Sequence, residues 1–304
     1  MNPAQATMTN QQQAKQQAQR LVSRRFAPRL PRKIATSAGM ITSLGTKRIV
    51  EQCAKIYLEW RSYNELPLGQ QDNLIQLCAF LEERSEIVQQ ATLSQSRNSL
   101  QLLYGIKLPV IHSQIQTCRV RRSYEANEIA QVITHQSEKN ALTTVIAYAA
   151  GLRAHEPATI RRLDELQPSS NREWDSRRFL GLGEIAMYIV TGKGGLRRQI
   201  ALPQDLADML ERRRLKSPEQ VVDRGIFYNR YYDIGFGQAF SQSFTDASKA
   251  GLRFSRGAHG LRHTYAKIRT QTLRALGLTL EQAQLIVSQE LGHFRPSITI
   301  AYYR

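Results

Sequence analysis

The sequence predicts a mainly α-helical protein with a small β-sheet, organised as two domains. The chain has 304 residues, enough for two domains of ordinary size, and its 41% hydrophobic content excludes a fully disordered protein. Apolar residues recur at helical spacing through most of the chain. An apolar, β-favouring stretch with a glycine-rich turn interrupts them at residues 185–203 and predicts the hairpin of the sheet.

Residues 1–41 are predicted to be a flexible, basic arm. Residues 1–50 contain nine Lys and Arg and no acid, and the Gln-rich beginning of the chain leads into an Arg-rich stretch broken by Pro28 and Pro31. Such a segment buries little apolar surface. We expect it to contact the phosphates of a nucleic acid, although a solvated tail without a ligand stays open. The candidate residues are Arg20, Arg24, Arg25, Arg29, Arg32 and Lys33.

Residues 42–115 are predicted to form a small helical bundle. Apolar residues within 49–60 recur at i, i+4, i+7, i+8 and i+11, which places them on one face of a helix. A second apolar set follows at 74–81. A third helix is expected to begin at Thr92 and to end near Gly105, because glycine favours the left-handed conformation that closes helices.

The rest of the chain, residues 116–304, is predicted to be a second domain. It opens with a basic linker in which Arg119, Arg121 and Arg122 are further candidates for DNA contact. Helices are expected before the hairpin at 185–203, and the pattern after the hairpin is mostly helical to the end of the chain.

The overall charge points to a polyanionic partner. The formal net charge is +17, which favours a nucleic acid. The longest uncharged apolar run has 11 residues, too few to span a bilayer, and the N-terminus lacks the apolar stretch of a secretion signal. Three cysteines without a CxxC pair argue against a disulfide framework or a structural zinc site. We therefore expect a cytoplasmic protein with a polyanionic partner, a nucleic acid, and no membrane contact.

Signatures of nucleotide and metal sites are incomplete in this chain. Residues 181–186 fit GxGxxA, but a strand follows them where a dinucleotide fold needs a helix. The Gly192-Lys193 pair lacks the Ser or Thr that ends a P-loop. His259 and His263 have the spacing of a zinc protease helix without its glutamate. The sequence therefore predicts no nucleotide or metal cofactor.

Residues that suit phosphate chemistry recur in the C-terminal half in a fixed order. Taken singly, each has an ordinary explanation, such as a surface cation, a polar residue at a helix start or a packed aromatic ring. Their order is hard to explain in that way. Along the chain they are Arg153, Glu156, Lys193, His259, Arg262, His293 and Tyr302.

The motifs that contain these residues resemble those of the tyrosine recombinases, the phage-integrase family of site-specific recombinases. The likeness covers residues 120–304, so 116–304 is expected to be a mixed α/β catalytic domain. It extends more loosely to 42–115, which is similar in size and place to the family's helical, DNA-binding core-binding domain. The motifs read GLRxxE at 151–156, GKG at 192–194, HxLRH at 259–263 and LGH at 291–293, with a tyrosine nine residues past the last histidine.

The resemblance implies an enzyme that cleaves and rejoins DNA strands at specific sites through a 3′-phosphotyrosyl intermediate, with Tyr302 as the nucleophile. It implies no cofactor, because the phosphotyrosyl bond keeps the energy of the broken strand. It further implies double-stranded DNA as the partner, and hence association with the nucleoid. The expected assembly is a homo-oligomer on DNA, a tetramer holding two duplexes, and an accessory directionality protein is allowed for.

The chemistry of phosphodiester cleavage agrees with these roles. Arg153 and Arg262 suit the phosphate oxygens, because a guanidinium donates in a bidentate fork and stays charged. Lys193, on a glycine-flanked hairpin tip, is the candidate general acid for the leaving 5′-oxygen. A tyrosine phenol, with an ordinary pKa of about 10, needs a base or a cationic site to attack near neutrality, and His259 is the candidate for that proton.

Supporting roles are expected for the remaining motif residues. His293 is the candidate for a hydrogen bond to the scissile phosphate, and Glu156 for holding the cations in place. His263 is expected to be structural. Tyr303 is the rival nucleophile, but the spacing from His293 favours Tyr302.

Two other functions stay open: a type IB-like DNA topoisomerase, which would use the same residues on one duplex, and a catalytically silent DNA-binding regulator. The chain ends two residues after Tyr302. Subunit contacts are therefore expected from elsewhere, such as the helical bundle, and residues 294–304 are expected to be mobile until DNA orders them. The spacing also favours attack by Tyr302 in cis.

Overall fold

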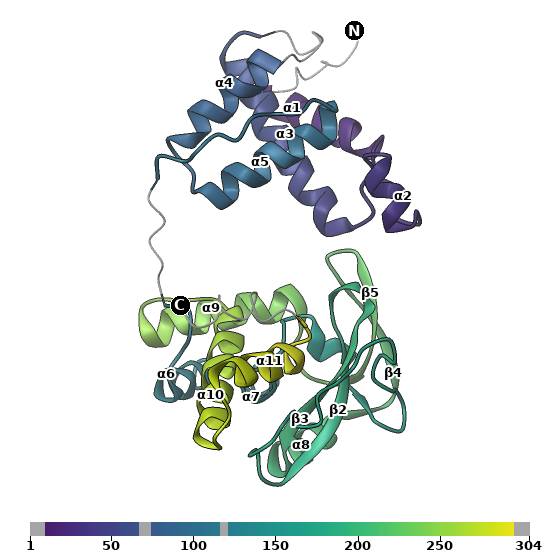
Figure 1. Ribbon diagram of the computed structural model, residues 1–304, viewed down its shortest axis with the longest axis vertical. Helices are drawn as coiled ribbons and strands as arrows, with labels where there is room; N and C mark the ends of the chain where they lie inside the picture. The colour runs from purple at the N-terminus through teal and green to yellow at the C-terminus, as the bar shows by residue number, and fades with distance from the viewer. Residues whose placement is uncertain (1–9, 67–73, 116–120, 295–304) are drawn as a thin grey trace, which may run out of the picture. The chain divides into compact units, whose positions relative to one another are not determined.

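The computed structural model describes residues 10–66, 74–115 and 121–294, apart from the side chains of Arg32 and Lys193. The chain divides into two compact units, Met1–Cys118 and Arg119–Arg304, and each is described by itself (Figure 1). Within the described ranges, no helix is long and apolar enough to cross a membrane.

The first unit is all-helical, which confirms the fold class predicted for this region. Ser43 caps the longest helix, because its side chain accepts a hydrogen bond from the backbone N–H of Thr46. The last helix ends at Gly105 in the left-handed conformation, as expected, but begins at Gln90 rather than at Thr92. The helices are α1 (Asn10–Ser23), α2 (Arg32–Ser37), α3 (Leu44–Tyr63), α4 (Leu74–Ser85) and α5 (Gln90–Tyr104).

Helix α1 shows that the expected flexible arm over residues 1–41 is wrong for its described part. Ala14, Ala18 and Val22 recur every four residues on one face and are buried in a cluster with Val50 and Leu58 of α3. Small side chains at this spacing let two helices approach closely. The composition misled the prediction because Gln, Lys and Arg occupy the remaining faces of α1. The packing continues beyond α1 to the buried Ile41.

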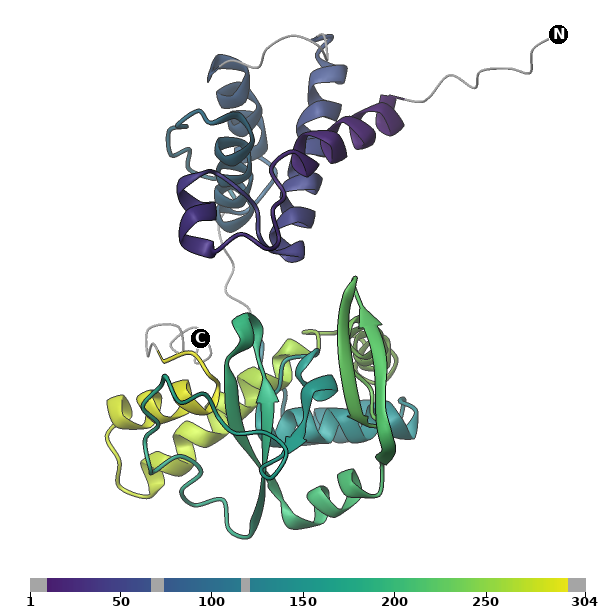
Figure 2. The ribbon, with the colours of Figure 1, turned by 90° about the vertical axis from the view of Figure 1, so that its right-hand side faces the viewer.

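The second unit combines helices with two small antiparallel sheets, one of which the sequence predicts. Helices α6, α7, α9, α10 and α11 lie to one side of the sheets in Figure 1, and Figure 2 views the sheets from the front. The helices are α6 (Ala126–Ile133), α7 (Glu138–Ala150), α8 (Gln204–Glu211), α9 (Gly237–Leu252), α10 (His259–Ala275) and α11 (Leu280–Glu290). The strands are β1 (Arg161–Arg162), β2 (Ile185–Thr191), β3 (Arg197–Pro203), β4 (Arg214–Asp223) and β5 (Ile226–Tyr232).

The predicted hairpin is confirmed as β2 and β3, which pair from Ile185↔Pro203 to Thr191↔Arg197. Strand β1 pairs with the other edge of β2, which gives the strand order β1-β2-β3. Tyr188 and Ile200 on the inner face of the hairpin are buried in the main core, together with apolar residues of α7 and α9. The sheet is therefore anchored to α9 and to α7, the helix that precedes the predicted motif at 151–156.

The helical pattern expected after Pro203 is wrong over residues 214–232, where β4 and β5 form a second hairpin. Most of β4 is exposed and polar, so it lacks the alternating pattern that reveals a half-buried strand. Pro218 lies inside β4, where the register shifts between Arg214 and Glu219. The signal that was present is the tight turn, in which Arg224 and Gly225 both have positive φ.

Replacing Ala18 with Leu should destabilise the first unit by about 1–3 kcal/mol, because the larger side chain overpacks the contact between α1 and α3. The matched control Gln16→Leu adds the same side chain at an exposed position and should change the free energy of unfolding by at most about 0.5 kcal/mol. Denaturant unfolding, followed by the fluorescence of Trp60 in a Trp174→Phe background, measures both. Equal changes in the free energy of unfolding for the two variants would support the flexible-arm interpretation instead.

Candidate functional site

Three helix ends bring together three of the predicted site residues, Arg153, Arg262 and His293. Helix α7 ends at Gly151 in the left-handed conformation, and Arg153 comes two residues later. Arg262 lies one turn inside α10, and His293 follows α11 after a turn at Gly292 with φ 71°. The Nη2 atoms of Arg153 and Arg262 lie 3.5 Å and 3.2 Å from Nε2 of His293. Both guanidinium groups therefore converge on one imidazole nitrogen.

Arg262 is fully buried and joins two helix ends. Its Nη1 donates a hydrogen bond of 2.5 Å to the carbonyl of Gly151, and its Nη2 donates to the carbonyl of Leu291. These residues are the C-caps of α7 and α11. A helix C-terminus carries unpaired carbonyls and partial negative charge, so a cation is favourable there. Arg262 is held rigidly by the fold before any ligand arrives.

The carboxylate of Glu156 is the centre of the cluster. It is fully buried, and Oε1 accepts a hydrogen bond of 2.8 Å from Nη1 of Arg153. Its Oε2 accepts 2.7 Å from Nη2 of Arg198 and lies 4.0 Å from Nη1 of Arg262. Burial alone would raise the pKa of Glu156, but the charges of Arg198, Arg262 and Arg153 reverse this and hold it well below its ordinary value. The geometry agrees with the supporting role proposed for Glu156.

Arg198 is a cluster residue that the sequence analysis missed. It lies on β3, is 1% exposed, and donates from Nη1 to the carbonyl of Glu290 at 2.8 Å. Its period-two partners on the strand, Ile200 and Leu202, are buried in the core. An arginine at an inward position of an otherwise apolar strand face requires a buried anion. This alternation of Arg198 with two buried apolar residues is the sequence signal that could have identified it as a cluster residue.

The hairpin tip with Lys193 begins beside this cluster. A Cβ atom on Gly192 would lie 3.1 Å from Oε1 of Glu156 and 3.5 Å from Nη1 of Arg153, so any larger residue would crowd the carboxylate. Lys193 opens a short 3-10 turn, Lys193–Gly195, directly after that glycine. The backbone of Lys193, the candidate general acid, therefore directly follows Gly192, which lies beside Glu156 and Arg153.

The two motif histidines are both held neutral. Burial, together with Arg262, Arg153 and Arg198, lowers the pKa of His293 to about 3. Since a guanidinium can only donate, Nε2 of His293 must be its unprotonated nitrogen. For His259, desolvation followed by the charges of Arg262, Arg153 and Arg122 lowers the pKa to about 4.

His259 lies at the start of α10 beside the linker. The residue is partly exposed, and its ring lies edge-on to that of the buried His263, with ring centroids 5.3 Å apart. Gly260 contacts the linker so closely that a Cβ atom there would lie 2.6 Å from the carbonyl of Arg122. This approach explains the glycine, and it places the charge of Arg122 near His259.

The other predicted residues divide into three groups. Tyr302, Tyr303 and Arg119 lie outside the described residues, as does the segment after Phe294. Arg121 is exposed and pairs with Glu125. In the first unit, Arg25 is half-buried and donates to the carbonyl of Leu103, whereas the exposed candidates are Arg20, Arg24, Arg29 and Lys33.

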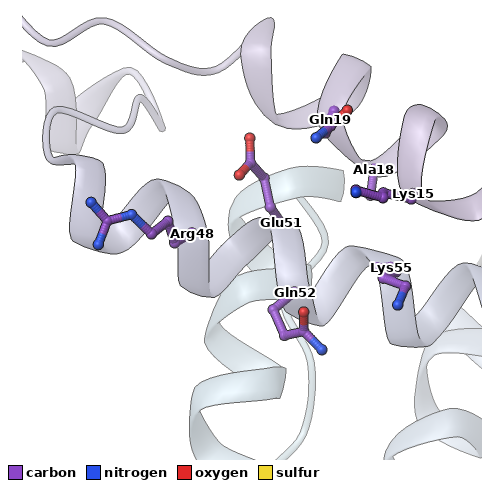
Figure 3. Close-up of a pocket in the computed structure, with 7 residues that line it drawn as sticks. All are labelled: Lys15, Ala18, Gln19, Arg48, Glu51, Gln52 and Lys55. Atoms are coloured by element: carbon purple, nitrogen blue, oxygen red, sulfur yellow. The ribbon is translucent and has the colours of Figure 1, made fainter. Parts of the chain in front are cut away.

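A second cationic feature lies between α1 and α3 in the first unit. A pocket of about 420 Å³ is lined by charged side chains from both helices, which Figure 3 labels. Lys15, Arg48 and Lys55 line it together with Glu51, and Lys55 also pairs with Glu59 at 3.4 Å. The sequence analysis missed this cluster because its residues come from two helices, one of which was not expected.

The arrangement in the second unit suits a phosphate. Three arginines share one buried carboxylate and both histidines are neutral, so the cluster keeps a net positive charge that a phosphodiester anion would balance. Among the described residues, no group of three or more His, Cys, Asp or Glu side chains could hold a metal ion.

Glu156→Gln should destabilise the second unit by about 3–5 kcal/mol, because it leaves buried arginines without their counter-charge. The control Glu219→Gln removes an ion pair with Arg230 in which the glutamate is half exposed, and should cost less than about 1 kcal/mol. Denaturant unfolding measures both free energies. A Glu156→Gln loss no larger than the control's would show that the arginines do not depend on the carboxylate.

Because the pKa values of His259 and His293 are lowered in the folded protein, its stability should decrease as the pH is lowered. Unfolded histidines bind a proton near pH 6.5, whereas folded His259 and His293 stay neutral down to about 4 and 3. The unfolded state therefore binds more protons below pH 6.5 and is favoured there. We expect Tm to fall between pH 7 and pH 5, and to fall less in the His259→Gln/His293→Gln double variant than in the exposed control His135→Gln. Parallel curves would refute the assignment.

Comparison with known proteins identifies the fold. No family model and no curated protein sequence matches the chain. A post-cleavage complex of the XerH site-specific recombinase with palindromic difH substrate matches with a TM-score of 0.58 and 16% identity, over 99% of this chain and 87% of that one. Its pre-cleavage complex with difH gives 0.54 and 15%, over 97% and 93%.

A second recombinase gives the same result. The Tn1549 transposon integrase in complex with transposon right end DNA matches with a TM-score of 0.53 and 13% identity, over 94% of both chains. At these identities the likeness is one of fold, and it extends over both units. The chain therefore has the fold of the tyrosine recombinases, as the order of its motifs predicts.

Proposed function

We propose that this protein is a site-specific DNA recombinase that cleaves and rejoins DNA strands through a 3′-phosphotyrosyl intermediate. The observation that carries the proposal is the convergence of Arg153 and Arg262 on His293, held by the buried carboxylate of Glu156. A preorganised pair of guanidinium groups can stabilise the charge that develops on the phosphate oxygens without rearranging.

In the proposed reaction, the phenolic oxygen of Tyr302 attacks the scissile phosphorus and the 5′-oxygen leaves. Neutral His259 takes the phenolic proton, and Lys193 gives a proton to the leaving oxygen. A bound phosphate offsets the arginine charges that depress the pKa of His259, so the base strengthens when DNA is present. The free 5′-hydroxyl later attacks the phosphotyrosyl ester and displaces the phenolic oxygen of Tyr302, which regains its proton. This step restores the phosphodiester without a cofactor.

The proposed partner is double-stranded DNA, bound by a homotetramer that holds two duplexes. The likeness to XerH on its difH substrate and to the Tn1549 integrase on transposon end DNA supports this partner. In the first unit, the exposed arginines and the lysines of the pocket between α1 and α3 offer phosphate contacts. We propose that this recombination takes place in the cytoplasm and that an accessory protein sets its direction.

Tyr302→Phe should abolish the covalent protein–DNA adduct while leaving DNA affinity within about twofold, because only the attacking oxygen is lost. The matched control Tyr303→Phe should form the adduct normally. The measurement is denaturing electrophoresis after incubation with nicked duplexes that carry candidate sites, chosen by searching for inverted repeats beside the gene. An adduct from Tyr302→Phe but not from Tyr303→Phe would assign the nucleophile to Tyr303. No adduct from the unaltered protein would favour a catalytically silent DNA-binding regulator.

A further inference from the structure

Phe294, the residue directly after His293, has an unusual backbone conformation. Its φ is +56°, in the left-handed region that side chains other than glycine and asparagine rarely adopt. Such a conformation persists only where neighbouring groups enforce it. The contacts of the Phe294 ring therefore show what holds the chain as it leaves His293.

The Phe294 ring is held by a loop between β1 and β2. It packs on the indole of Trp174, with ring centroids 4.8 Å apart and planes inclined by 60°. The guanidinium of Arg172 lies 5.2 Å from the centroid of the Phe294 ring, and that of Arg178 lies 4.5 Å from the indole. Trp174 is fixed in turn, because its Nε1 donates to the carbonyl of Ser169 at 3.1 Å.

The same loop is bound to the end of α11. The backbone N–H of Asp175 donates to the side chain of Gln289 at 2.7 Å, and that of Phe179 donates to Glu290 at 2.8 Å. Glu290 is buried and also binds Arg269 and Tyr265. Trp174 and His293 are therefore attached to one rigid frame, since both are anchored at the last turn of α11.

We propose that Trp174 and Phe294 form a positioning pair that fixes the direction in which the chain leaves His293 and thereby aims Tyr302 at the phosphate. The inference rests on the proposed function, because it concerns the delivery of its nucleophile. Neither ring touches the reacting atoms in this role. Their contribution is to align Tyr302 before attack, and misalignment by about 1 Å can cost on the order of 100-fold in rate.

The test is single-turnover adduct formation at saturating nicked duplex, with DNA affinity measured separately. Trp174→Ala and Phe294→Gly should each slow the adduct rate constant roughly 10- to 100-fold, with affinity unchanged within about twofold. Trp174→Phe, which keeps an aromatic ring, should recover most of the rate. The double variant should be no slower than the slower single variant, because the two rings act as one unit. The matched control Phe254→Ala removes another partly exposed ring that lies under a guanidinium, that of Arg256, and should have no effect.

Three results would overturn the positioning pair. An unchanged rate in Trp174→Ala would do so directly. Weaker DNA binding with an unchanged rate would assign Trp174 to DNA contact, and a smaller adduct amplitude with an unchanged rate constant would assign the pair to folding alone. The proposed function is judged separately by Tyr302→Phe, since loss of its adduct stands whatever the Trp174 variants do.

Discussion

The second unit depends on one buried carboxylate. Three arginines could not lie within reach of one another in a low-dielectric interior without an anion between them. Glu156 supplies that anion, and the surrounding backbone is shaped to reach it. Gly192 brings the hairpin within van der Waals distance of the carboxylate, and Arg198 extends the network to the end of α11. The local structure of four separate segments is therefore set by a single charge.

The same network sets the protonation of its histidines. Desolvation and adjacent guanidinium groups act in the same direction on His259 and His293, so both rings are acceptors in the free protein. An anion in the site would offset the second of these causes, the guanidinium charges, and so raise the pKa of both rings. His259, the residue proposed to accept the phenolic proton, is thus a stronger base with a phosphate in the site than without one.

The sequence was most informative where side-chain type and spacing are required by chemistry. The motif order predicted the recombinase fold, and the hairpin at 185–203 and the helix end at Gly105 followed from local rules. Arg198 was missed because its role depends on partners 42 and 92 residues away in the chain. Helix α1 was missed because its alanines are too weakly apolar to stand out among glutamines, although they pack well against α3. Strand β4 was missed because its exposed, polar residues take their conformation from pairing with β5.

Arg262 has a consequence for how such a protein could change over time. Its guanidinium ties the carbonyl ends of α7 and α11 together in the fully buried interior, besides facing His293. Under the proposed function, a lineage that no longer needed strand cleavage could not easily discard this residue, because the fold would lose a structural brace along with the chemistry. His259, at the start of α10, is more exposed than the fully buried Arg262. Decay of activity in descendants of this chain would therefore begin at the surface of the site, and a buried arginine could long outlast the reaction it once served.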